Sequence, residues 1–161
     1  MQGKMAESEK KLQFLLSLLE YKGVAKRELA RMLGMTPQSI FTYFKRDDMK
    51  LSFAQTVASK LGYELVFRLE KADAQLQSGA LEIEAPAGDG GLSRLSFLRV
   101  ALQQYGISRK ELAEKLELHY MGVNRWFKVD DIAISYLYEI AQLYGLQVKV
   151  KAVALPPDAV K

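Results

Sequence analysis

Two acidic pairs are the first candidates in the sequence for a catalytic or metal-binding role. Asp47-Asp48 and Asp130-Asp131 would suit a divalent cation only if further acids converged on them, as a metal-dependent nuclease requires. The chain has no cysteine, and His119 is its single histidine. The sequence has no nucleophile with a histidine partner and no glycine-rich phosphate loop. We therefore expect no enzyme, no bound metal and no cofactor, and assign the acidic pairs to turns and helix dipoles.

The distribution of charge favours an anionic partner instead. Residues 12–71 hold 10 Lys and Arg against 6 Asp and Glu, and residues 92–161 hold 10 against 7. Residues 72–91, between them, hold four acids and no base. Two basic modules joined by an acidic segment suit a polyanion, although a solvated surface of mixed sign would give the same counts.

Composition sets the general class of the protein. A hydrophobic content of 49% is typical of a globular chain. No apolar run approaches the roughly 18 residues of a membrane span, and the polar N-terminus does not resemble a signal peptide. We expect a cytoplasmic protein that does not enter a membrane.

Two stretches with a shared pattern would position the basic and polar side chains. Residues 26–45 (KRELARMLGMTPQSIFTYFK) and 109–128 (RKELAEKLELHYMGVNRWFK) align without a gap, 83 positions apart. A longer alignment, of 12–67 with 95–150, contains sixteen identical pairs, which indicates an internal repeat. Each stretch has Glu-Leu-Ala near its start and an aromatic pair before a lysine. This spacing predicts two short helices joined by a tight turn, with a small alanine at their crossing.

The flanking sequence predicts the other elements of each repeat. Each repeat is expected to have four helices followed by a β-strand. The expected ranges are helices 11–22, 26–33, 37–45 and 52–62 with strand 63–70, and in the second repeat a first helix over 92–105, the helix pair, a fourth helix over 135–145 and strand 146–153. Ser52 and Gln55 have capping-box spacing, so Ser52, and Ser135 in the second repeat, are expected to cap the fourth helices.

The first stretch resembles the helix-turn-helix of lambda-repressor-like (Cro-type) DNA-binding domains. That family usually has a polar residue and Glu-Leu-Ala, then a turn glycine and a second helix rich in Ser, Thr and Gln. The first stretch has Gly34 at the turn and Thr-Pro-Gln-Ser at 36–39. The second keeps Val123 and Trp126 but has Glu117 where the glycine is usual. Since glycine serves a left-handed backbone there, this turn is expected to be strained or differently shaped.

The resemblance implies a set of DNA contacts for the first repeat. Its second helix would enter the major groove and present its N-terminal side chains to base edges. The residues that would face bases are Pro37, Gln38 and Thr42, and Gln38 could form two hydrogen bonds with adenine. The residues that would contact the sugar-phosphate backbone are Lys26, Thr36, Ser39, Lys45, Arg46 and Lys50. Thr36 is also placed to cap this second helix.

The corresponding set in the second repeat has different chemistry. Tyr120, Met121 and Arg125 would face bases, with Asn124 beside them, and Arg125 suits guanine. Arg109, His119 and Lys128 would contact phosphate. Because the two sets differ at every base-facing position, one chain is expected to favour an asymmetric site.

Several residues of the two stretches also have a purely structural interpretation. The aromatic residues are expected to be packing groups rather than platforms for stacked bases: Phe41, Tyr43, Phe44, Trp126 and Phe127. Tyr120 and Met121 could instead mark a protein-binding patch. His119 is expected at the surface, without a role as a pH switch.

The sequence therefore predicts a mainly α protein with two tandem lambda-repressor-like helix-turn-helix domains, each followed by a C-terminal β-strand. The expected domains are 1–71 and 92–161, with 72–91 as an acidic linker rich in Gly and Ala. Within the linker, 81–84 could form a short strand that pairs back on 63–70. The two long strands could pair with each other or with a second chain, so the resemblance also permits a homodimer through the C-terminal strands.

The expected function is sequence-specific binding of double-stranded DNA by a transcriptional regulator, with recognition helices near 37–45 and 120–128. The family implies a bacterial or phage setting. The alternative is a helix-turn-helix protein-interaction module, such as an antitoxin-like partner, with weak or no base readout.

Overall fold

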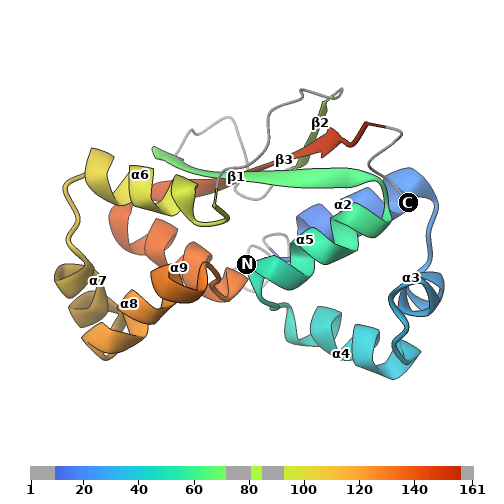
Figure 1. The fold of residues 1–161 in the computed structure, drawn as a ribbon, viewed down its shortest axis with the longest axis horizontal. Helices are drawn as coiled ribbons and strands as arrows, with labels where there is room; N and C mark the ends of the chain where they lie inside the picture. The colour runs from blue at the N-terminus through green and yellow to red at the C-terminus, as the bar shows by residue number, and fades with distance from the viewer. Residues whose placement is uncertain (1–9, 72–80, 85–92, 157–161) are drawn as a thin grey trace, which may run out of the picture.

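The computed structural model describes residues 10–71, 81–84 and 93–156, and this part of the chain is mainly helical with a small sheet (Figure 1). The first repeat forms α2 (Gln13–Lys22), α3 (Lys26–Leu33), α4 (Pro37–Arg46), α5 (Leu51–Lys60) and β1 (Tyr63–Lys71). After β2 (Leu81–Glu84), the second repeat forms α6 (Ser96–Gln104), α7 (Arg109–Leu116), α8 (Tyr120–Val129), α9 (Ile134–Tyr144) and β3 (Leu146–Ala154). Each helix and long strand expected from the sequence is present. Apart from β2, the expected linker lies outside the described residues.

The two long strands pair with each other inside one chain, which resolves the alternatives left by the sequence. β1 and β3 are antiparallel, with Phe67 opposite Val150 at the middle of the ladder. β2 pairs with β3 in parallel, so the expectation that 81–84 would return to β1 is wrong. Two parallel neighbours need a long connection, and the helices α6 to α9 lie in the chain between β2 and β3. As a result, β3 is the central strand of the sheet.

The repeats are related by an approximate two-fold axis. Phe67 and Val150 are equivalent positions of the two repeats, and they lie directly opposite each other in the sheet. Lys50 and Ala133 are also equivalent positions, and they form an isolated antiparallel bridge. A residue can lie opposite its own equivalent only on a symmetry axis, so the axis passes through both pairs. The chain therefore folds like a symmetric dimer whose two halves are covalently joined.

The repeats exchange hydrogen bonds at the N-termini of α5 and α9. Leu51 N donates to Ile132 O at 2.8 Å, and, reciprocally, Ile134 N donates to Met49 O at 2.9 Å. Leu51 and Ile134 are the first residues of α5 and α9, and the acceptors Ile132 and Met49 lie in the segments just before these helices. Each fourth helix thus begins on a backbone contact with the other repeat.

The expectation that Ser52 and Ser135 cap their own helices is wrong. Both α5 and α9 begin one residue before these serines, and neither has a side-chain cap from its own N-cap residue. Instead Ser52 N donates to Asp131 Oδ1 at 2.9 Å, and Ser135 N donates to Asp48 Oδ1 at 2.9 Å. The Ser52 hydroxyl donates to the same Asp131 carboxylate. Carboxylates from the opposite repeat therefore satisfy helix N-termini that would otherwise lack acceptors.

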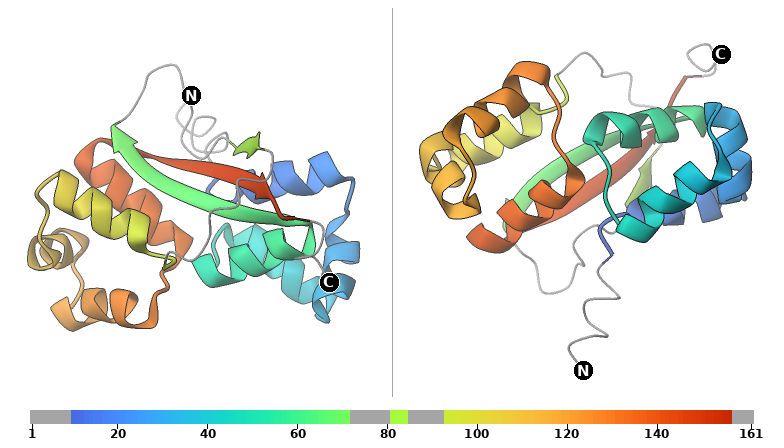
Figure 2. Two further views of the ribbon diagram at one scale, coloured as in Figure 1. Left: turned by 45° about the horizontal axis from the view of Figure 1, so that its top comes forward. Right: turned by 90° about the horizontal axis from the view of Figure 1, so that it is seen from below.

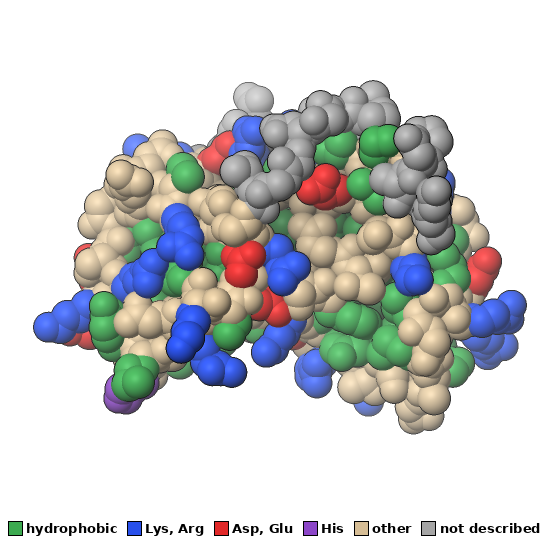
Figure 3. All heavy atoms as spheres, in the orientation of Figure 1, with side chains coloured by type: hydrophobic (Ala, Val, Ile, Leu, Met, Phe, Trp, Pro, Cys, Tyr) green, Lys and Arg blue, Asp and Glu red, His purple; other side chains and the backbone are tan. Residues whose placement is uncertain are grey.

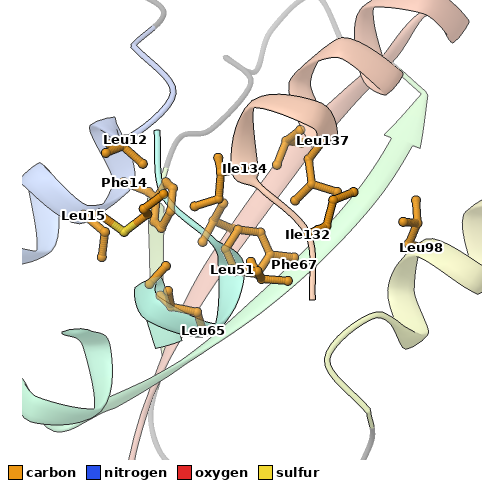
Figure 4. Close-up of a cluster of buried hydrophobic side chains, with 14 of the residues drawn as sticks. Leu12, Phe14, Leu15, Leu51, Leu65, Phe67, Leu98, Ile132, Ile134 and Leu137 are labelled. Carbon is orange, nitrogen blue, oxygen red and sulfur yellow. The ribbon is translucent and has the colours of Figure 1, made fainter. Parts of the chain in front are cut away.

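One cluster of buried side chains runs through both repeats (Figure 4). Phe67 lies at its centre, with its ring 5.5 Å from that of Phe14 and 5.8 Å from that of Phe97, centroid to centroid. Phe14 and Phe97 are equivalent positions, so the axial ring contacts both halves. Leu65 and Val148 are buried with it, as the alternation of the strands predicts.

No helix within the described residues is both long enough and apolar enough to cross a membrane.

Candidate nucleic-acid interface

The two helix pairs lie on the same side of the molecule, away from the sheet. In Figure 1 the sheet runs across the top, while α3 and α4 lie at the lower right and α7 and α8 at the lower left. The view from below in Figure 2 shows the two pairs again, α3 and α4 on the right and α7 and α8 on the left. The pseudo-two-fold axis therefore relates α4 to α8.

The first helix pair turns at Gly34. This residue has φ 69° and ends α3, and Met35 N donates back to Ala30 O at 2.8 Å. Thr36 then caps α4, because its Oγ1 accepts from Ser39 N at 3.2 Å. The predicted capping role of Thr36 is confirmed.

The second helix pair has the same turn without a glycine. Glu117 takes the place of Gly34 with φ 57°, and Leu118 N donates to Ala113 O at 2.9 Å, as Met35 does to Ala30. The turn is thus strained but not differently shaped. A left-handed conformation costs a non-glycine residue roughly 1–2 kcal/mol. At the next residue, the cap of α8 is His119, whose Nδ1 accepts from Met121 N at 3.2 Å.

Four exposed side chains form what we call the outer face of α4: Gln38, Phe41, Thr42 and Lys45. Their spacing of three and four residues places them on one side of the helix. The Thr42 hydroxyl donates to Gln38 O at 2.9 Å, so this donor is already used by the helix backbone. The Gln38 side chain makes no hydrogen bond to any other described residue and is free to bind a ligand.

Phe41 corrects one prediction. The sequence predicts packing in the core or at its edge for this ring, but 45% of Phe41 is exposed. The other aromatic residues of the helix pairs do pack: Tyr43 stacks on Phe53 with centroids 4.7 Å apart, and Trp126 lies 5.1 Å from Tyr136. Phe44 is half-buried, and Phe127 is buried. The hydrophobicity of Phe41 gives no signal that this side chain is exposed. Phe41 and its buried neighbour Ile40 differ only in the side of α4 to which each side chain points.

The outer side of α8 presents both apolar and cationic groups. Met121 is 70% exposed and Tyr120 47%, and Arg125 is exposed without a hydrogen bond or ion pair to any described residue. Asn124 differs, because its Oδ1 accepts from Arg109 Nη1 at 3.0 Å. The side-chain amide oxygen of Asn124 is therefore already bonded within the protein.

Cations lie over aromatic rings at equivalent places in the two pairs. Arg109 stacks 4.1 Å above the Phe127 ring, and Lys26 lies 5.1 Å above Phe44. These contacts hold the first residue of α7 or α3 against the second helix of its pair. The sequence predicts phosphate contacts alone for Arg109 and Lys26, and residue types give no signal of their contact with the rings.

The cations near the axis are not distributed symmetrically. Lys45, Arg46, Lys50 and Lys128 are exposed. The second repeat has Val129 and Ala133 at the positions of Arg46 and Lys50. A hollow of about 410 Å³ beside the axis is bordered by Arg46, Lys50 and Ala133. Figure 3 shows Lys and Arg side chains along the lower part of the molecule, over both helix pairs, with acidic side chains nearer the centre.

The acidic pairs serve structure, as predicted. Asp47 Oδ2 and Oδ1 accept from Lys11 N at 2.8 Å and Leu12 N at 3.0 Å. Asp130 accepts in the same way from Arg94 N and Leu95 N, at 2.8 and 3.0 Å. Both aspartates are left-handed C-caps of the preceding helix. Among the described residues, no three His, Asp or Glu side chains are grouped as a metal site would require.

A tyrosine anchors the second helix pair to α9. The Tyr144 hydroxyl donates to Glu111 Oε2 on α7 at 3.0 Å. Partial burial, together with the Glu111 carboxylate, raises the pKa of Tyr144 to about 12, so the hydroxyl stays protonated and continues to donate at neutral pH.

Comparison of the chain with protein-family models, curated proteins and solved structures found no match.

Proposed function

We propose that the protein binds double-stranded DNA sequence-specifically, as a transcriptional regulator, through two lambda-repressor-like helix-turn-helix units. One observation carries the proposal: α4 and α8, which the pseudo-two-fold axis relates, lie on the same side of the molecule, and each turns uncommitted polar or cationic side chains outward. On B-DNA, two helices related in this way suit successive major grooves, whose centres are roughly 34 Å apart.

The stoichiometry follows from the sheet. Paired β1 and β3 join the two halves of one chain as C-terminal strands would join two subunits. β3 already has strand neighbours on both edges, in β1 and β2. We therefore propose one chain per DNA site, in place of a homodimer joined through the C-terminal strands.

Each half would read a different sequence. Gln38 on α4 offers an amide that can bond to both N6 and N7 of adenine, and Arg125 on α8 offers a guanidinium that suits O6 and N7 of guanine. Phosphate contacts would come from residues around each helix N-terminus and from the cations that follow α4. The expected operator is asymmetric.

The test begins with selection of bound sequences from a random duplex pool. Gln38→Ala and Arg125→Ala should each weaken binding to the selected site by about 1–3 kcal/mol and relax preference at one position, in different halves. Gln142→Ala, an exposed glutamine of α9, is the matched control and should change neither property. A selected site that is a perfect inverted repeat of one word would contradict the asymmetric operator.

Salt dependence supplies the second arm of the test. A protein that neutralises six or more phosphates should lose roughly a thousandfold in affinity for duplex DNA between 50 and 200 mM salt. Absence of binding at low salt would overturn the proposal.

The exposed Met121 and Tyr120 favour one other candidate, a protein-interaction module of the antitoxin type. In that case α8 would bind a protein partner, and base readout would be weak or absent. The predicted observation is binding to random duplex with little dependence on salt and no enrichment of any sequence during selection.

A further inference from the structure

Phe41 occupies an unusual place for an exposed aromatic residue. It lies on the outer face of α4, three residues after Gln38 and four before Lys45. The neighbouring Tyr43 and Phe44 pack against the buried cluster of the protein, whereas Phe41 does not belong to it. The ring therefore contributes little to the fold, and its exposed part is available for contact with a ligand.

Around Phe41, and apart from the Lys45 ammonium group, the outer face of α4 is poor in free hydrogen-bonding groups. The Ser39 hydroxyl, beside this face, is paired with Thr36 Oγ1 at 2.9 Å. The Thr42 hydroxyl donates to the backbone at Gln38, so its methyl group remains as the part available for contact. An aromatic ring and a methyl group thus lie next to one free amide.

The surrounding charge indicates which kind of ligand fits these apolar groups. Lys45 follows Phe41 by one helical turn, and Arg46 comes next. An apolar protein partner seated on Phe41 would have to desolvate these cations without pairing them. A duplex would place its phosphates near the cations and its base edges near the ring.

Building on the proposed function, we propose that Phe41 and the Thr42 methyl group read the 5-methyl group of thymine. This methyl is the distinctive apolar feature of the major groove, and Phe and Thr are side chains that contact it. With Gln38 reading adenine beside them, the half-site of the first repeat consists of A·T pairs at its centre.

The second repeat provides the contrast. Asn124 replaces Phe41 and is held by Arg109, while Arg125 replaces Thr42 and is free. Its half-site should contain a guanine at the position read by Arg125. The methyl contacts assigned to Phe41 and Thr42 then have no counterpart at the equivalent positions, Asn124 and Arg125, of the second repeat.

The experiment replaces each thymine of the selected site, one at a time, by deoxyuridine, which removes only the methyl group. For the wild-type protein, one or two replacements in the first half should weaken binding by about fourfold each, the value of one buried methyl. Phe41→Ala should bind the thymine site more weakly and lose most of the difference between thymine and deoxyuridine. Phe41→Leu, which keeps an apolar side chain, should retain part of it.

The outcomes separate this inference from the proposed function. Equal affinity for every deoxyuridine site, with Gln38→Ala still weakening binding, overturns the role of Phe41 and leaves DNA binding intact. An unchanged deoxyuridine effect in Phe41→Ala also overturns it. Failure of the wild-type protein to select any sequence overturns the proposed function itself. Because Phe41 lies outside the buried cluster, its variants should melt as the wild type does, and a lowered melting temperature would contradict that placement.

Discussion

The two helix pairs agree in their interiors and differ on their surfaces. Both have a left-handed turn residue, an aromatic pair packed between the third and fourth helices of the repeat, and a cation over a phenylalanine ring. On the outside, Phe41 corresponds to Asn124, and Arg46 to Val129. The comparison teaches that the packing positions are constrained equally in both copies by the shared axis, while the outward positions are free to specialise.

The largest expected effect comes from removing the residue that both halves share. Phe67→Ala should lower the free energy of unfolding by about 3–5 kcal/mol, because the axial ring contacts Phe14 and Phe97 at once. Urea unfolding should be followed both by circular dichroism and by the fluorescence of Trp126, which lies in the second repeat. The two signals should fall together.

Val150→Ala is the matched control on the same axis, and it should destabilise less because fewer buried methyl groups are lost. If Phe67→Ala left the Trp126 transition unchanged, the two halves would unfold independently. The shared axis would then not constrain the packing of both copies.

The exchanged caps are the next largest effect. Asp131→Ala should lower the free energy of unfolding by about 1–2 kcal/mol, as loss of a helix N-cap does. Asp48→Ala should cost less, because Asp48 accepts the backbone N–H groups of Ser135 and Met49. Asp131 accepts the equivalent N–H groups of Ser52 and Ile132 and, in addition, the Ser52 hydroxyl. Thermal or urea unfolding of the two variants measures the difference, and an equal loss would show that the extra hydroxyl bond contributes nothing.

The asymmetric cations should appear in the salt dependence of DNA binding. Arg46→Ala and Lys50→Ala should each reduce the slope of log K against log salt by about 0.9, one phosphate contact apiece. Val129→Lys and Ala133→Lys restore the missing cations on the other side of the axis and should increase the slope. If the second pair of variants had no effect, the DNA would not approach the second repeat as it does the first.

The turn residues give the smallest effect. Glu117→Gly should stabilise the protein by about 1 kcal/mol, because glycine adopts the left-handed conformation without a steric penalty. Gly34→Ala should destabilise it by a similar amount. Melting curves of the two single variants should therefore shift in opposite directions, and a loss of stability in Glu117→Gly would mean that the glutamate makes a favourable contact that offsets its backbone strain.

Sequence periodicity predicted the helices and long strands because each follows from local spacing. The repeat alignment then placed Gly34 and Glu117 at equivalent turns. The predictions that failed concern contacts whose partner residue is distant in the sequence. Ser52 and Ser135 looked like caps by local spacing, yet the acceptors come from Asp131 and Asp48, more than seventy residues away.

The candidate interface was predictable in part for the same reason. Thr36 caps α4 as its position implied, since a cap depends only on neighbours within one turn. The engagement of Asn124 by Arg109 depends on how two helices cross, and the exposure of Phe41 depends on the rotation of α4 about its own axis. Neither quantity can be read from residue types alone.

The axial pairing of Phe67 with Val150 has a consequence for how occupancy of a target would respond to protein level. A regulator assembled from two chains falls apart on dilution, so its binding curve steepens at low concentration. Here one chain contains both halves, so no assembly step precedes binding at any concentration. Occupancy of the target should therefore follow a simple hyperbola against protein concentration, with no threshold. Such a molecule would grade its response smoothly with the number of copies in the cell.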